Sequence, residues 1–178
     1  MKKLIAFILT LVCLLSCAVP ALAAEKSGFQ NFKKTAKYTD GIFSDVKETD
    51  WYRESVAAAY ELGLMQGGGD GTFNAAGNVT IAETLVLADK LHSIFNTGSA
   101  KFTTGEPWYQ TYVDYALKNG IMDAGMKNYD AAVTRGEFIR LFYNALPEKE
   151  YVGINLIMDG AIPDVATDAP LAKQVYTF

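Results

Sequence analysis

One short motif occurs twice in the chain, at residues 79–83 and 133–137, and each copy opens a strongly apolar run. In both copies a Thr is followed three positions later by a Glu. The Thr oxygen can then accept a backbone N–H from the first turn while the Glu accepts the N–H of the Thr, so each copy predicts a helix start. Because the sequences around Thr80 and Thr134 also match, the two copies indicate a tandem repeat.

Each repeat also predicts a helix upstream of its capping motif. In the first repeat this helix covers residues 51–62, with Asp50 as its N-cap and Gly63 as its left-handed stop. A glycine-rich loop follows, and the helix opened by the first motif covers residues 81–95, with apolar side chains along one face. The first repeat is therefore predicted to be a helix-loop-helix unit.

The second repeat contains the same parts. Pro107 suits the first position of a helix, Trp108 opens that helix and Gly120 ends it. The interval from Trp51 to Trp108 equals the interval from Gly63 to Gly120. The capping motifs are slightly closer together than this, because the loop that follows Gly120 is shorter than its counterpart in the first repeat.

A third copy begins near Ile162, and its first helix starts at Leu171, shortly before the last residue of the sequence. We interpret the chain as a fragment of a longer protein, with a degenerate last repeat as the alternative. The predicted fold class is all-α, built from tandem helix-loop-helix repeats. The predicted organisation is a signal peptide at 1–23, a linker at 24–41, repeat 1 at 42–97, repeat 2 at 98–148 and the start of a truncated repeat 3 at 149–178.

The segment 1–23 has the features of a secretory signal peptide. Lys2 and Lys3 precede an apolar run, and the sequence at 21–23 is Ala-Leu-Ala, which fits the small-x-small cleavage site. The run is too short for a comfortable membrane span, and no later stretch approaches the roughly 20 residues that a spanning helix needs. Residues 14–17 also resemble a lipobox, so lipidation of Cys17 is the less favoured alternative.

Cleavage after Ala23 removes both cysteines, Cys13 and Cys17. The mature chain then has no thiol for a disulfide, for zinc or for catalysis, and we expect neither a metal ion nor a cofactor. It also loses two of the 16 basic residues while keeping all 20 acidic ones, which gives a net charge of −6. A nucleic-acid partner requires a basic face, so this class of partner is not expected.

Two features could be mistaken for catalytic or nucleotide sites. The loop at 66–73 is rich in glycine but lacks both the Lys-Ser/Thr ending of a P-loop and the alternating carboxylates of an EF-hand. We interpret it as a tight turn whose exposed amides could face a glycan. His92 lies in mid-helix without a nucleophile marked by any motif, and we expect a packed or surface histidine.

Several short motifs follow one another in a fixed order, and together they resemble the S-layer homology domain family. In chain order they are Phe-x-Asp-Val, Trp-Tyr, a helix ending in Gly-Leu or Gly-Ile, Gly-Thr-Phe and Val-Thr-x-x-Glu. The resemblance covers residues 43–146 as two repeats and 162–178 as a partial third. It implies a pseudo-threefold helical bundle, with one central helix per repeat and grooves between the outer helices. It also implies a non-catalytic module of an exported bacterial protein in the cell wall or S-layer, which binds secondary cell-wall polysaccharide or a peptidoglycan-linked glycan non-covalently.

The family signature at the second helix start is Thr-Arg-Ala-Glu, and the ligand often bears pyruvate ketals. Repeat 2 retains the arginine as Arg135, whereas repeat 1 has Ile81. A guanidinium can hold a planar carboxylate through two parallel hydrogen bonds, and a helix N-terminus adds amides and partial positive charge. We therefore expect Arg135 to bind the ligand, and the groove at the first motif to bind weakly or to use Lys90 or Arg53.

The candidate ligand-binding residues are Arg135, Trp108, Trp51, Thr134, Glu137, Gly68, Gly69, Asp70 and Glu83. Capping alone explains Thr80, Thr134 and both glutamates, and we favour that structural role over ligand contact. The two tryptophans could stack on a sugar or seal the seam between repeats. Two alternatives to a simple anchor remain: the anchor part of an exported enzyme whose catalytic module lies beyond Phe178, or a subunit of the surface lattice.

Overall fold

The computed structural model describes residues 27–151, 157–158 and 160–177. Within these residues the fold is all-α, as predicted, with no β-strand and one isolated bridge between Thr80 and Ala132. The elements in chain order are η1 (Phe29–Asn31), α2 (Arg53–Glu61), α3 (Ile81–Thr97), α4 (Gln110–Lys118), α5 (Arg135–Ala145), η2 (Glu148–Glu150) and α6 (Ala172–Thr177). The predicted signal peptide lies outside the described residues.

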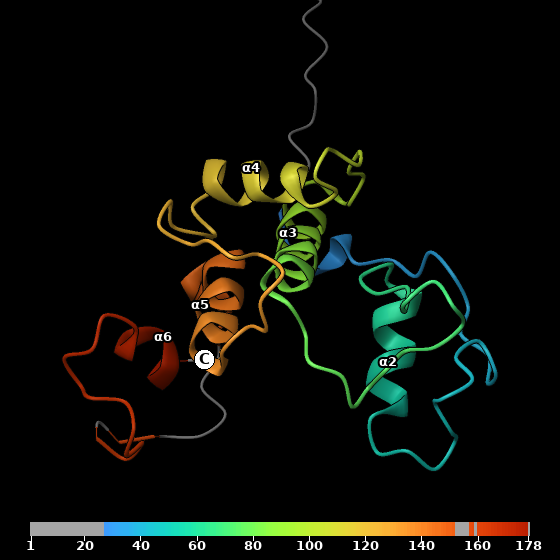
Figure 1. Ribbon diagram of the computed structural model, residues 1–178, viewed down its shortest axis with the longest axis horizontal. Helices are drawn as coiled ribbons and strands as arrows, with labels where there is room; N and C mark the ends of the chain where they lie inside the picture. Colours follow the sequence, from blue (N-terminus) through green and yellow to red (C-terminus); the bar gives the residue numbers. More distant parts are fainter. Residues whose placement is uncertain (1–26, 152–156, 159, 178) are drawn as a thin grey trace, which may run out of the picture.

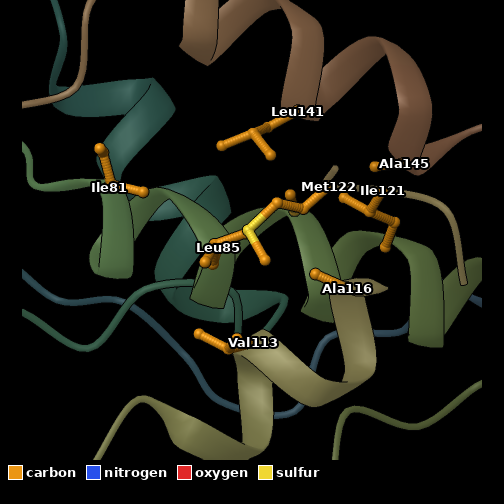
Figure 2. Close-up of a cluster of buried hydrophobic side chains, with 9 residues drawn as sticks. Ile81, Leu85, Val113, Ala116, Ile121, Met122, Leu141 and Ala145 are labelled. Carbon is orange, nitrogen blue, oxygen red and sulfur yellow. The ribbon is translucent and has the colours of Figure 1, made fainter. Parts of the chain in front are cut away.

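α3 is the central helix. In Figure 1 it lies between α2 on one side and the α5–α6 pair on the other, with α4 across one end. The main apolar core lies where α3, α4 and α5 meet (Figure 2), and its members come from both repeats. Its buried residues are Ile81, Leu85, Ala88, Val113, Ala116, Ile121, Met122, Leu141 and Ala145. The two predicted repeats therefore contribute to one core.

A second, smaller core holds α2. Val56 and Ala57 on this helix pack against Tyr38, Phe43 and Val46 from the segment that precedes it. The ring of Phe43 meets that of Tyr60 edge-on, with centroids 5.7 Å apart. Much of the packing around α2 therefore comes from irregular chain rather than from another helix.

The segment before repeat 1 is irregular apart from η1, and it is packed rather than free. The Gly28 N–H donates to the Phe95 carbonyl at the end of α3 (2.9 Å), and the Thr35 N–H donates to the Glu61 carbonyl at the end of α2 (2.7 Å). Glu61 also pairs with Lys34. Residues 28–38 thus connect the C-terminal ends of α2 and α3.

Both capping boxes form as predicted. Thr80 accepts the Glu83 N–H while Glu83 accepts the Thr80 N–H, and Thr134 and Glu137 do the same at the start of α5. The left-handed stops are also confirmed, because φ is +73° at Gly63 and +70° at Gly120. These local signals needed no information about the rest of the chain.

Two predicted helix starts are wrong. Asp50 does not cap α2, because its carboxylate accepts the Lys47 N–H (2.8 Å) and the Tyr52 hydroxyl (3.1 Å) and so closes the preceding turn. Pro107 is not the first helical residue either. It precedes a turn, and its carbonyl accepts the N–H of Gln110, where α4 begins. Both tryptophans therefore lie just before their helices.

Candidate functional site

A cavity of about 420 Å³ lies where the two predicted repeats meet, a size typical of small-molecule sites. We call it groove 1. Its described lining residues are Leu64, Met65, Gln66, Gly67, Gly68, Phe73, Asn74, Gly77, Asn78, Val79, Glu83, Val86, Leu87, Lys90, Thr104, Trp108 and Tyr112. Three of the predicted site residues, Gly68, Glu83 and Trp108, line this one cavity.

Three parts of the chain form the walls of groove 1. α3 contributes Glu83, Val86, Leu87 and Lys90, whose spacing of three, one and three positions places them on one face of the helix. The loop after α2 forms a second wall. The third wall is the start of repeat 2, including Trp108 and, one helical turn later, Tyr112, which the sequence analysis missed although its spacing from Trp108 was a usable signal.

Trp108 is partly exposed and packs against a neighbouring aromatic ring. Its side chain is 45% exposed, and its ring meets that of Tyr109 at a centroid distance of 5.5 Å. Trp51 occupies the same position in repeat 1 and meets Tyr52 in the same way, but it is 91% exposed and lies outside groove 1. The structure thus separates two tryptophans that the sequence treats alike.

Lys90 is the one cationic residue among the described lining of groove 1. Its ammonium donates to the carbonyls of Gly63 (3.2 Å) and Leu64 (3.3 Å) at the end of α2. Burial lowers the pKa of Lys90. The alternative cation, Arg53, is bonded to Asp40 and Glu54 and is not among the described lining residues of groove 1, so the expectation that this groove could use Arg53 is wrong.

The glycine-rich loop does not offer all the amides that we expected. The Gly68 N–H donates to the Thr72 carbonyl (2.9 Å), and the Asp70 carboxylate accepts both the N–H and the hydroxyl of Thr72. Gly67 requires a glycine, because φ is +74° and an added Cβ would lie 2.4 Å from the Phe43 ring. Gly69 and Asp70 are exposed and lie outside groove 1.

The start of α3 offers few free amides as well. The N–H groups of Ile81 and Ala82 donate to the carbonyls of Ala131 and Tyr129, each at 2.9 Å. Repeat 2 thus covers this helix end. Glu83 lines groove 1, but the Oε2 atom of its carboxylate accepts the N–H (2.8 Å) and the hydroxyl (3.0 Å) of Thr80.

Arg135, Thr134 and Glu137 lie at the start of α5, outside groove 1. Arg135 is exposed, and no carboxylate of the described residues pairs with it. Arg135 therefore does not contribute to groove 1. The ligand-binding role of Arg135 stays a prediction.

Behind groove 1, α3 buries an acid that the sequence analysis did not single out. Asp89 is fully buried, and neither of its carboxylate oxygens has a hydrogen-bond partner among the described residues. Burial raises the pKa of Asp89 to about 8. His92 is a packed histidine, as expected, with its Nδ1 atom 2.8 Å from the Tyr115 hydroxyl.

Comparison with known proteins identifies the first repeat. The family model described as the S-layer homology domain matches residues 42–85. This range includes the segment before α2, α2 itself, the loop that follows and the first part of α3. The chain carries an S-layer homology domain. Such a domain is a non-catalytic module for anchoring at the cell surface.

The relatives that the chain matches include enzymes and surface proteins. The chain is 31% identical over 120 residues to "Amylopullulanase" of Thermoanaerobacterium thermosulfurigenes, which covers 60% of this chain and 6% of that protein. It is 27% identical to "Surface-layer 125 kDa protein" of Lysinibacillus sphaericus (64% and 10%) and 26% identical to "Cell surface protein" of Thermoanaerobacter kivui (80% and 18%). The chain thus spans under a fifth of each relative's length. No solved structure matches it.

The domain and these relatives support an exported location in the cell wall or S-layer. In the part of the chain that the structure describes, no helix is long and apolar enough to cross a membrane. The same residues contain no group of three His, Cys, Asp or Glu side chains that could hold a metal ion.

Proposed function

We propose that the chain holds an exported protein on the bacterial surface by binding secondary cell-wall polysaccharide non-covalently in groove 1. The observation that carries the proposal is the placement of Trp108 in an open cavity at the meeting of the two repeats. The resemblance implies that such polysaccharide is often pyruvylated and anionic.

The chemistry of groove 1 suits a sugar. Trp108 and Tyr112 offer aromatic surface to the C–H face of a pyranose ring, and amphipathic rings of this kind combine apolar contact with a polar edge. Gln66, Asn78 and Thr104 add side-chain donors and acceptors for hydroxyl groups. A cavity with apolar walls and a few polar groups is the usual form of a small-molecule site.

A single sugar contact is weak, so retention on the wall requires several contacts at once. If the wall polymer presents repeated units, a second occupied groove makes binding intramolecular and raises the effective concentration. Arg135 at the start of α5 is our proposed residue for a second groove. Removing either groove should then reduce retention more than additively.

Co-sedimentation with purified cell walls tests this function. The exported chain should pellet with intact walls and stay in solution with walls stripped of their polysaccharide. Equal pelleting on both would contradict the proposal.

Substitution of the aromatic wall locates the binding site. We expect Trp108→Ala to weaken wall binding about tenfold, because loss of one aromatic contact costs roughly 1.4 kcal/mol. Trp51→Ala is the matched control, since Trp51 has the same sequence context but lies outside groove 1. A larger loss in Trp51→Ala would move the site away from groove 1.

A second candidate is that the chain anchors an enzyme. The matches to "Amylopullulanase" and to "Exoglucanase XynX" of Acetivibrio thermocellus cover only 6% and 11% of those proteins, so the shared part is a small module of a much longer chain. The sequence that follows Phe178 in the source reading frame decides between this arrangement and a surface-lattice subunit, which "Surface-layer 125 kDa protein" exemplifies.

A further inference from the structure

The two repeats place their cations at different positions. Lys90 and Asn144 occupy equivalent positions of α3 and α5 and make equivalent hydrogen bonds: Lys90 donates to the Gly63 and Leu64 carbonyls, and Asn144 donates to the Ile121 carbonyl (3.1 Å). Both side chains thus hold the end of the outer helix. An amide is sufficient for that structural task, so the charge of Lys90 is not explained by it.

At two other equivalent positions, repeat 2 has the cation and repeat 1 has an apolar residue. Repeat 2 has Arg135 and Arg140 where repeat 1 has Ile81 and Val86. Arg140 is neutralised by an ion pair with Asp123. Repeat 1 therefore lacks both arginines, and Lys90 is the cation that remains in the described lining of its groove.

The charge of Lys90 has no neutralising partner among the described residues. The ion pairs of this part of the chain do not include it. Asp89 is adjacent in sequence, but its oxygens are buried without any partner. Lys90 has three donors and uses two of them on carbonyls, which leaves one N–H for a ligand.

We propose that Lys90 recognises the anionic group of the wall ligand in groove 1, in place of the helix-tip arginine that repeat 1 lacks. The inference rests on the proposed function and specifies its ligand: a sugar that carries a carboxylate, with the ring against Trp108 and the carboxylate toward the end of α2. Lys90 lies half-buried among apolar Val86, Leu87 and Phe73, where a charge pair is screened less than at the surface.

The test measures charge preference rather than binding alone. The exported chain is co-sedimented with native walls and with walls whose carboxyl groups have been reduced to alcohols. The unsubstituted chain should bind native walls about tenfold more tightly. In Lys90→Gln the amide can still donate to the Gly63 and Leu64 carbonyls, as Asn144 does in repeat 2, and this variant should bind both kinds of wall equally.

Two further variants control for folding and net charge. Lys90→Arg should restore the preference for native walls. Lys118→Met removes an exposed lysine of α4 outside groove 1 and should keep the preference intact. Circular dichroism checks that each variant retains its helix content.

The possible outcomes separate the two proposals. If Lys90→Gln keeps the preference of the unsubstituted chain, or if the unsubstituted chain binds native and carboxyl-reduced walls alike, the assignment of Lys90 is overturned while wall anchoring stands. If the unsubstituted chain also ignores removal of the whole polysaccharide, the proposed function fails and the role of Lys90 fails with it.

Discussion

α3 and α5 begin with the same capping box but lie in different surroundings. α3 is packed by η1, α4 and α5, and carbonyls of repeat 2 cover its first amides. α5 packs on α3 and α6, and no described carbonyl accepts the N–H of Arg135 or Gly136. One motif thus starts two helices, and their neighbours decide that α3 becomes the central helix (Figure 1) while Arg135 at the start of α5 stays exposed.

The largest expected difference is in the free energy of unfolding that is lost when an equivalent apolar side chain is truncated on each helix. Leu85 on α3 is fully buried, whereas its equivalent on α5, Ile139, is partly exposed. Leu85→Ala should lower the free energy of unfolding by about 4 kcal/mol through lost burial and a cavity. Ile139→Ala should cost roughly 1–2 kcal/mol. Chemical denaturation of both variants checks this, and equal costs would show that the two helices are equally buried.

Sequence reasoning succeeded where the signal is local. The two capping boxes, and with them the starts of α3 and α5, and the left-handed glycines after α2 and α4 depend on a few neighbouring residues, and these predictions are confirmed. The start of α2 was wrong because Asp50 has two local partners that compete with the helix, and the start of α4 was wrong because a turn follows Pro107. The order of parts along the chain, rather than any one residue, carried the family resemblance.

The candidate site was only partly predictable. Trp108, Glu83 and Gly68 line groove 1 as a group, since the repeat pattern brings the loop and both helix starts together. Tyr112 was missed because only its spacing of one helical turn from Trp108 indicated it, and that spacing alone does not show which way this face of α4 is turned. The occupied amides of Ile81 and Ala82 could not be foreseen either, because their acceptors lie far away in the sequence, in repeat 2.

The next largest expected effect is a pH dependence of stability that only repeat 1 should contribute. Asp89 is buried in α3, while the equivalent position in α5 is Tyr143, so this acid belongs to repeat 1 alone. Burial raises the pKa of Asp89 to about 8. Between pH 4 and pH 8 the folded state holds a proton that the unfolded state releases, so stability falls as pH rises through this range and levels off above it.

Asp89→Asn removes this titration. The variant should match the unsubstituted chain near pH 4 and exceed its free energy of unfolding at pH 8. Four pH units at roughly 1.4 kcal/mol each set an upper limit of about 5.6 kcal/mol, and we expect about half of that because the site relaxes when Asp89 ionises. Urea denaturation at pH 4, 6 and 8 measures the difference. Parallel pH profiles for the two proteins would mean that Asp89 finds a partner when it ionises.

The smallest effect tests the two capping boxes directly. Thr134→Ala should cost about 1 kcal/mol, because the Glu137 N–H loses its acceptor and no described carbonyl accepts the N–H of Arg135 or Gly136. Thr80→Ala removes the same bond at Glu83, but the Ile81 and Ala82 N–H groups remain bonded to repeat 2, so a cost of about 0.5 kcal/mol is expected. Hydrogen exchange at Glu83 and Glu137 reports the fraying of each end. The contradicting outcome is faster exchange at Glu83 in Thr80→Ala than at Glu137 in Thr134→Ala. It would show that the carbonyls of Ala131 and Tyr129 do not hold the start of α3. The contrast between the two helices would then arise only from their apolar faces.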